Sequence, residues 1–193
     1  EVEDDMVIQP NCAYIIPPAH DMAILDGQLH LLEPSAPHGL RLPIDYFFRS
    51  LAQDQRERAI CIVLSGTGSD GALGVRAVKE AGGMAMAQTL DSSAFDGMPH
   101  SAIATGLIDF VLPPAEMPAQ LIAYVDHVFG KMPRLTLSPT LQMEDYLEKI
   151  FILLRAQTGH DFSQYKLNTI TRRVERRMAL QQISKMDDYV RYL

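Results

Sequence analysis

The stretch "IVLSGTGSDGALGVRAVKEAGG", residues 62–83, decides the fold class of this chain. It begins inside an apolar, β-branched run, 59–66, that is typical of a strand covered on both faces. Glycines and an aspartate follow, and the apolar spacing then predicts a helix over 70–81 that ends at Gly82 and Gly83. A strand that leads through a glycine-rich turn into a helix indicates a parallel α/β sheet.

The elements that follow continue this alternation. Apolar runs predict strands over 84–88 and 107–114, with a turn at 97–99 and a short helix between them. A helix over 115–130 follows the last strand. Because strands and helices that alternate through short connections form right-handed crossovers, we expect an α/β fold with a doubly wound, mostly parallel sheet.

The segment before this sheet predicts a strand over 13–18, a hairpin of two strands and a helix. Residues 13–18, AYIIPP, form a short apolar run stopped by two prolines, and an Asp-Gly pair within 22–34 predicts a β-hairpin. Apolar residues at helical spacing, with Pro43 in the first turn, predict an amphipathic helix over 42–54. The α/β domain is therefore expected to begin with a β-hairpin.

Charge and composition divide the 193 residues into two parts. The net charge is −7, but residues 1–130 carry −11 and residues 131–193 carry +4. Residues 131–142 contain prolines and no periodic pattern, which indicates a linker, and the rest of the chain predicts only helices. We expect a partial α/β domain over 1–130, a linker over 131–142 and a partial, small all-α domain over 143–193.

The glycine-rich turn allows more than one function. Residues 66–71, GTGSDG, match the G-x-G-x-x-G pattern of dinucleotide-binding loops, and Asp91 lies 20 positions after Gly71, where that pattern places an acidic residue. Against a dinucleotide stands Asp70, because its carboxylate repels a pyrophosphate and competes for the positive end of the helix. A second interpretation is that Asp70 only caps a helix. In a third, the turn holds Asp70 in place for another chemistry.

Longer motifs resemble two families in order and spacing. Residues 1–126 contain "YIIPP", "GLRLPIDYFFRSLA", "IVLSGTGSDGALG", "VKEAGG", "FDGMPHSAIATG" and "DFVLPP". This segment resembles the C-terminal two-thirds of the chemotaxis protein-glutamate methylesterase domain, CheB. Residues 143–193 contain "TGHDFSQYKLNTITRRVERRM" and "DDYVRYL" and resemble the N-terminal helical part of the methyltransferase CheR. The tandem is similar to hybrid proteins that carry both enzymes, and the chain is expected to be a fragment of one.

The resemblance implies a hydrolase that cleaves γ-glutamyl methyl esters, and deamidates glutamines, on chemoreceptor helices with a Ser-His-Asp triad. The triad aspartate falls on Asp70, which in that template accepts the imidazole Nδ1–H. Thr67 stands where many members have Met, and its backbone N–H is expected to contribute to the oxyanion hole. The family's Ser and His fall upstream of Glu1, so the fragment alone is expected to be inactive. None of the chain's six histidines matches the family base.

The all-α segment carries a basic cluster on one predicted helix, formed by Arg172, Arg173, Arg176 and Arg177. A solvated helix face is the simplest interpretation. The resemblance implies instead that Arg173, Arg176 and Arg177 face the acidic methylation region of the receptor. Nucleic acid is a weaker alternative, because the patch is short and the whole chain is acidic.

The resemblance also implies a cytoplasmic protein of two-component chemotaxis signalling with a phosphorelay. The sequence has no apolar run near 18 residues, so no membrane insertion is expected. No metal and no cofactor is expected in this chain, whereas S-adenosylmethionine is expected to bind a methyltransferase domain downstream. The main alternative function is a non-catalytic regulatory module that binds the receptor, and the second is a dinucleotide-binding oxidoreductase.

Overall fold

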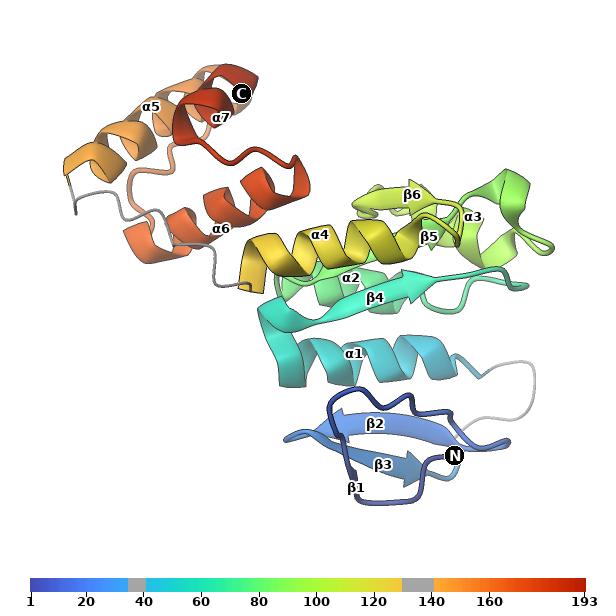
Figure 1. Ribbon diagram of the computed structural model, residues 1–193. Helices are drawn as coiled ribbons and strands as arrows, with labels where there is room; N and C mark the ends of the chain where they lie inside the picture. Colours follow the sequence, from blue (N-terminus) through green and yellow to red (C-terminus); the bar gives the residue numbers. More distant parts are fainter. Residues whose placement is uncertain (35–40, 130–140) are drawn as a thin grey trace. The chain divides into compact units, whose positions relative to one another are not determined.

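The computed structural model describes residues 1–34, 41–129 and 141–193. The chain divides into two compact units, residues 1–117 and residues 118–193. Figure 1 shows the secondary-structure elements of both units.

A small antiparallel sheet opens the first unit. It consists of β1 (Met6–Val7), β2 (Asp21–Leu25) and β3 (Gln28–Leu32), in the order β1-β3-β2. Between β2 and β3, Asp26 has a φ of 50° and Gly27 a φ of 75°, as a two-residue hairpin turn of type I′ requires. The predicted hairpin is confirmed.

Residues 13–18, all of them described, form no strand, so that expectation is wrong. The Val2 N–H donates to the carbonyl of Ile15 (3.0 Å), but the ladder does not continue. Pro17 and Pro18 have no N–H to donate to a neighbouring strand. A short apolar run therefore did not suffice to predict a strand here.

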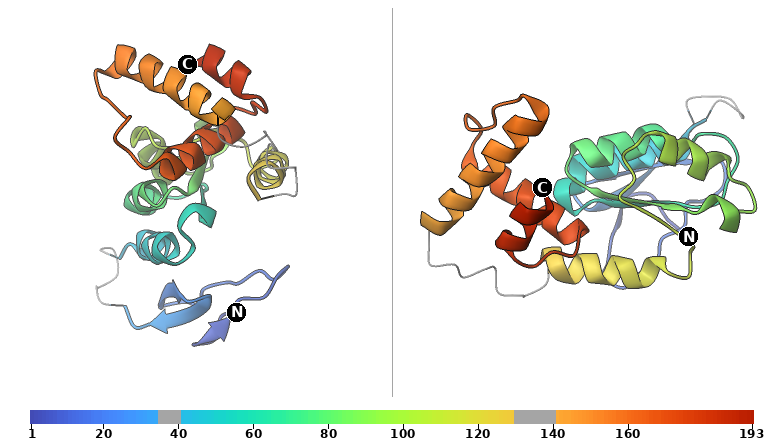
Figure 2. Two further views of the ribbon diagram at one scale, coloured as in Figure 1. Left: turned by 90° about the vertical axis from the view of Figure 1, so that its left-hand side faces the viewer. Right: turned by 90° about the horizontal axis from the view of Figure 1, so that it is seen from above.

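The parallel sheet follows the first helix of the unit. The elements are α1 (Pro43–Gln55), the 3₁₀ turn η1 (Arg56–Arg58), β4 (Ile60–Val63), α2 (Ala72–Glu80), β5 (Met84–Gln88), the 3₁₀ turn η2 (Leu90–Ser92), α3 (Gly97–Ala104) and β6 (Phe110–Leu112). The strands pair in parallel in the order β4-β5-β6. Helix α1 lies between the hairpin sheet and α2 (Figures 1 and 2), and the predicted α/β class is confirmed.

The strands differ in how far they are buried. Every residue of β5 is buried, whereas in β4 Cys61 and Val63 are buried and Ile60 and Ile62 are only half-buried. The expectation that the run over 59–66 is covered on both faces is therefore wrong for β4. The reason is its place at one end of the strand order, while β5 lies in the middle.

The second unit is helical. Its helices are α4 (Met117–Phe129, whose first residue belongs to the first unit), α5 (Leu141–Thr158), α6 (Leu167–Leu180) and α7 (Met186–Tyr192). The apolar faces of α5, α6 and α7 form a core of Leu147, Ile150, Ile170, Val174, Met178, Met186 and Tyr189. Residues 131–140 of the predicted linker lie outside the described residues, and its last two residues begin α5. Among the described helices, none is both long and apolar enough to cross a membrane.

Candidate active site

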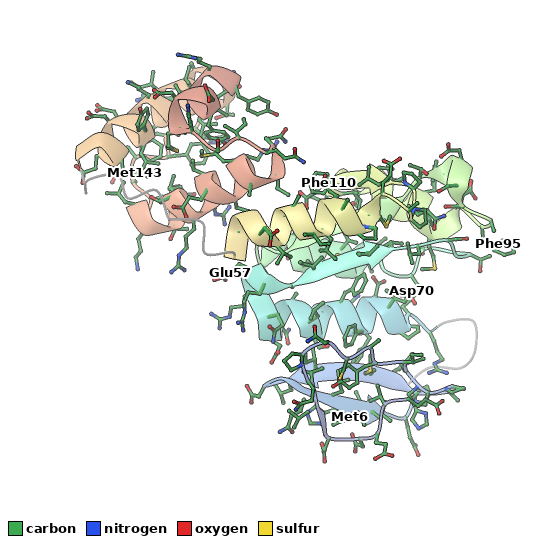
Figure 3. All side chains as sticks on the ribbon, viewed as in Figure 1. Met6, Glu57, Asp70, Phe95, Phe110 and Met143 are labelled. Atoms are coloured by element: carbon green, nitrogen blue, oxygen red, sulfur yellow. The ribbon has the colours of Figure 1, made fainter. Side chains whose placement is uncertain are left out.

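Two loops meet at the carboxyl end of the parallel sheet. Residues 64–71 follow β4, and the other loop leads from β5 and η2 into α3. The Gly66 N–H donates to the carbonyl of Phe95 (2.9 Å), and the Met98 N–H donates to the carbonyl of Gly66 (2.9 Å). Figure 3 shows Asp70 and Phe95 at this same end of the sheet. The turn that decides the fold class is thus joined to the loop that carries FDGMP.

Side chains fasten both loops to the sheet. Gln88, the last residue of β5, is buried, and its Oε1 accepts a hydrogen bond from the Ser65 N–H (2.9 Å). Its Nε2 donates to the carbonyl of Ser92 (2.8 Å). Ser65 Oγ in turn accepts from the Phe95 N–H (2.9 Å). Because a buried amide holds one loop on each side, the backbone of this edge is fixed.

Gly97 shows why the edge is rich in glycine. A Cβ at this position would lie 2.9 Å from the nitrogen and 3.1 Å from the oxygen of Gly68, and both are backbone atoms. The glycines therefore let two backbones approach each other closely. This contact gives the G-x-G-x-x-G spacing a structural role that involves no phosphate.

The Asp70 carboxylate caps a helix other than the one that it precedes. Its Oδ2 accepts from the Ile44 N–H (3.0 Å) and its Oδ1 from the Asp45 N–H (2.8 Å). These are the second and third residues of α1, which Pro43 begins. The residue before α2 is Gly71, which has no side chain to cap that helix. The interpretation of Asp70 as a helix cap is therefore confirmed, and the helix that it caps is α1.

This arrangement fixes the plane of the Asp70 carboxylate. Two backbone N–H groups and the positive end of the α1 dipole face the carboxylate. The side chain is half-buried, so it is also accessible. A carboxylate offers about four lone-pair positions, and the two backbone bonds leave others for a further donor. Chemically, the site can hold a fixed negative charge beside an N–H or a cation.

Thr67 lies at the exposed tip of the same loop. Within the described part of the chain, no acceptor receives a hydrogen bond from its backbone N–H. Gly68, the next residue, has a φ of 85°. The Thr67 N–H is thus a backbone donor without an internal partner in those residues, close in sequence to Asp70.

The basic cluster on α6 divides into exposed and engaged arginines. Arg173 and Arg177 are exposed, as is Arg172. Arg176 is half-buried, donates from Nη2 to the Tyr124 hydroxyl (2.7 Å) and lies 5.9 Å from the centre of that ring. Such a pair combines a charge-assisted hydrogen bond with a cation–π contact. Arg176 therefore serves to attach α4 to α6 within the second unit.

Each of the two parts of the chain matches the model of a known protein family. Residues 1–121 match the model of the CheB methylesterase. The chain belongs to the CheB methylesterase family. Residues 145–193 match a second model, that of the all-alpha domain of the CheR methyltransferase. Asp70 and Thr67 lie in the first match, and the α6 arginines lie in the second.

Individual relatives agree with this assignment. An uncharacterized 104.1 kDa protein of Rhodobacter capsulatus is 37% identical over 212 aligned positions, which cover 100% of this chain and 22% of that protein. A protein-glutamate methylesterase/protein-glutamine glutaminase of Halobacterium salinarum is 50% identical over 76 residues, 39% of this chain and 22% of the relative. The chain thus spans 22% of the length of each of these curated relatives.

A solved structure supports the fold of the family. The CheB methylesterase catalytic domain of Thermotoga maritima matches with a TM-score of 0.58 at 29% identity, over 63% of this chain and 67% of that domain. The resemblance to CheB and CheR is therefore confirmed.

The histidines of the described part do not contact Asp70. Four histidine side chains are described: His20, His30, His100 and His160. His20 Nδ1 lies 2.9 Å from the carbonyl of Pro18, and His30 Nδ1 lies 2.8 Å from Asp5 Oδ1. His100 and His160 are exposed. The side chains of the other two, His38 and His127, lie outside the described residues.

One group of side chains among the described residues has the spacing of a metal site. Ligand atoms of Asp4, Asp5 and His30 lie within 4.8 Å of one another. The two aspartates are exposed, and the His30–Asp5 ion pair already accounts for the approach. The group lies on the hairpin sheet, in a different element from the loop of Asp70.

Sequence reasoning missed two residues of these sites, Asp45 and Tyr124. Asp45 was hidden in an amphipathic helix pattern, where a carboxylate in the first turn is ordinary. Tyr124 is 1% exposed, and a tyrosine within a largely apolar helix gives no separate signal in the sequence. One signal for Asp45 did exist, namely its position in the sequence between Ile44 and Phe48. Both of these apolar residues are half-buried and lie on the face of α1 that meets α2.

Proposed function

We propose that the full-length protein is a cytoplasmic protein-glutamate methylesterase and glutamine deamidase that acts on chemoreceptor helices through a Ser-His-Asp triad. Asp70 is the triad acid. The Ser and the His come from polypeptide outside these 193 residues, and the 193-residue chain alone is inactive. In the same polypeptide, a methyltransferase would use S-adenosylmethionine bound outside this chain.

The proposed reaction proceeds through an acyl-enzyme. The Ser Oγ bonds to the ester carbonyl carbon while the His Nε2 takes the hydroxyl proton, and the carbonyl oxygen becomes an oxyanion. The Thr67 N–H donates to this oxyanion. The C–O bond to the methoxy group then breaks, and methanol leaves with the proton from the imidazolium. Water repeats the sequence on the acyl-enzyme and releases glutamate; for glutamine the first leaving group is ammonia.

The observation that carries the proposal is the capping of α1 by Asp70. A triad aspartate must present a fixed, ionised carboxylate to the imidazole Nδ1–H so that the ring keeps one tautomer. Two backbone N–H bonds at 2.8 and 3.0 Å fix this carboxylate at the carboxyl end of a parallel sheet, where α/β proteins bind their ligands. The family match over residues 1–121 supplies the reaction.

The proposal is tested by methanol release from a methylated receptor with the full-length protein. Asp70→Asn is expected to lower turnover by about 10⁴, the scale known for a triad aspartate in a protease. Asp96→Asn is the matched control, because Asp96 is an exposed carboxylate on the neighbouring loop. A full-length Asp70→Asn protein that keeps more than a tenth of its turnover would contradict the triad. A wild-type protein that binds receptor without releasing methanol would favour the regulatory module instead.

We further propose that α6 contacts the acidic methylation region of the receptor through its exposed arginines. Arg173 and Arg177 support this contact directly, since both are exposed, and Arg176 supports it by attaching α6 to α4. Receptor capture at rising salt should weaken, because screening reduces contacts between exposed charges. Arg173→Gln and Arg177→Gln should each reduce capture, whereas Lys149→Gln on α5 serves as control. Capture that is insensitive to both salt and these arginines would exclude the contact.

A further inference from the structure

Asp45 is a charged residue buried in the first unit. Its side chain belongs to the first turn of α1 and is 1% exposed. Its Oδ1 accepts a hydrogen bond from the Gly74 N–H (2.6 Å). Its Oδ2 is buried and has no hydrogen-bond partner among the described residues. A buried carboxylate oxygen without a partner is unfavourable, so the residue needs an explanation.

The hydrogen bonds of Asp45 and Asp70 form a reciprocal pair of helix caps. The Asp45 N–H, on α1, donates to Asp70 Oδ1, and Asp70 stands two residues before α2. In the opposite direction, the Gly74 N–H, on α2, donates to Asp45 Oδ1. Each helix therefore has its first turn capped by a carboxylate that belongs to the other side of the junction. The first turns of α1 and α2 are locked together through these two side chains.

These two hydrogen bonds between the helix ends also affect how the Asp70 carboxylate is held. Both of its donors, Ile44 and Asp45, belong to α1, whereas its own backbone leads into α2. A shift of α1 along α2 would move the donors away from the carboxylate that they hold. The bond between Gly74 and Asp45 opposes this shift, because it ties the same two turns together.

The charge of Asp45 is unfavourable where it lies. Burial raises the pKa of its carboxyl group above the ordinary value for aspartate, and the negative charge of Asp70 raises it further. The Gly74 N–H and the nearby Arg49 act in the opposite direction. An apolar residue would avoid this penalty. Ionisable groups whose charged form is disfavoured by their surroundings are typical of functional sites.

We propose that Asp45 is a positioning residue that holds the Asp70 carboxylate in its productive orientation by locking the first turn of α1 to the first turn of α2. The inference rests on the proposed function, in which Asp70 is the triad acid. The inference concerns geometry: the side chain at position 45 must offer an oxygen acceptor to the Gly74 N–H, and its negative charge is not required.

The test uses methanol release by the full-length protein with three variants of Asp45. Asp45→Ala removes the acceptor for Gly74 and is expected to lower kcat about 10- to 100-fold, the usual scale for a residue that orients a catalytic group, with KM changed less than about twofold. Asp45→Asn keeps an oxygen acceptor without charge and should keep kcat within about threefold of wild type. Asp45→Glu keeps the charge but displaces the acceptor, and should lose activity as Asp45→Ala does.

Two further measurements separate positioning from a structural role. In an Asp70→Asn background, Asp45→Ala should cause no additional loss of kcat, because a residue that acts through Asp70 cannot act without it. Asp109→Ala is the control, since Asp109 is another carboxylate with little exposure that accepts a backbone N–H. It should lower the unfolding midpoint and leave kcat per folded molecule unchanged.

The outcomes distinguish this inference from the proposed function. If Asp70→Asn abolishes turnover but Asp45→Ala and Asp45→Glu keep it, Asp45 does not position Asp70. The same holds if the losses of Asp45→Ala and Asp70→Asn multiply. If Asp45→Ala does not fold, the contrast between Asp45→Asn and Asp45→Glu decides alone. If Asp70→Asn is fully active, the proposed function itself fails.

Discussion

Two aspartates at opposite ends of the parallel sheet, Asp70 and Asp109, hold their charges in different ways. Both accept backbone N–H bonds from another element: Asp70 from Ile44 and Asp45, and Asp109 from Ala85 (2.9 Å). Asp109, however, also has Lys79 Nζ at 2.6 Å from both of its oxygens, and its side chain is 8% exposed. Asp70 is half-buried and has the carboxylate of Asp45 as a charged neighbour.

The difference separates a structural carboxylate, Asp109, from the carboxylate that we propose as the triad acid, Asp70. Asp109 precedes β6 and lies at the amino end of the strands, where its charge is neutralised by Lys79 and directed into the fold. Asp70 lies at the carboxyl end, and in the part of the chain that the structure describes its hydrogen-bond donors are two backbone N–H groups at the positive end of α1. A charge stabilised in this way remains available to an external N–H, whereas a carboxylate paired with a lysine does not.

The largest expected effect, after that of Asp70 itself, concerns Thr67, whose backbone N–H we propose as the oxyanion donor. Thr67→Ala should keep turnover within about threefold, because the backbone N–H remains. Thr67→Pro removes the N–H and should lower kcat by about 10² to 10³, and Thr67 has no positive φ that would exclude proline. Methanol release by the two full-length variants checks this, with circular dichroism to verify folding. Equal activity of both variants would remove Thr67 from the oxyanion hole.

The second prediction concerns stability at the amino end. Asp109→Ala leaves Lys79 and the Ala85 N–H without their partner and is expected to lower the free energy of unfolding by about 3 kcal/mol. Urea unfolding of the full-length protein measures this. Turnover per folded molecule should not change. A loss of turnover at full stability would mean that both ends of the sheet serve the reaction.

A pair of glycines extends the comparison to the backbone. A Cβ at Gly97, at the carboxyl end, would meet Gly68 backbone atoms, and one at Gly83, at the amino end, would lie 2.7 Å from the carbonyl oxygen of Ala59. Each alanine variant should therefore lower stability by about 1–3 kcal/mol. Only Gly97→Ala should also lower kcat, because it displaces the loop of Thr67. Similar kcat values for the two variants, measured on folded protein, would refute this.

The smallest effect is a pH dependence of stability. The pKa of Asp45 is raised in the fold, chiefly by burial and further by Asp70, against the influence of Arg49. The folded state therefore holds this proton more tightly, and stability falls as pH rises from 3.8 through the folded pKa. The Asp45→Asn side chain does not ionise, so this variant does not lose stability as the pH rises. Its free energy of unfolding should be higher than that of wild type at pH 7 and equal to it below pH 3.8. Urea midpoints across this range check the sign, and a difference independent of pH would contradict it.

Much of the fold followed from local patterns in the sequence. The Asp-Gly hairpin, α1 with Pro43 in its first turn, and β5 over residues 84–88 were predicted at or near their observed limits. Each depends on turn chemistry or periodicity within a few residues. The failures, at residues 13–18 and in the burial of β4, concern how a strand meets its neighbours, which a local pattern does not contain.

The candidate site shows the same limit more clearly. Asp70 was singled out from its turn and from the resemblance to the family, and it remains a prediction. Its donor Ile44 is 26 positions away, and Arg176 is 52 positions from its partner Tyr124. Such contacts depend on how helices pack against each other, and a cap on a distant helix has no signature in the sequence around it.

The most direct test of the difference between Asp70 and Asp109 is nitrogen-15 NMR of the histidine that we propose as the triad base, in the full-length protein. An acceptor at Asp70 should keep the neutral imidazole protonated at Nδ1. Asp70→Asn is therefore expected to lose this tautomer, whereas Asp109→Asn keeps it. If the histidine of Asp70→Asn retained the wild-type tautomer and Nδ1–H signal, Asp70 would not orient the imidazole, and the account would be contradicted.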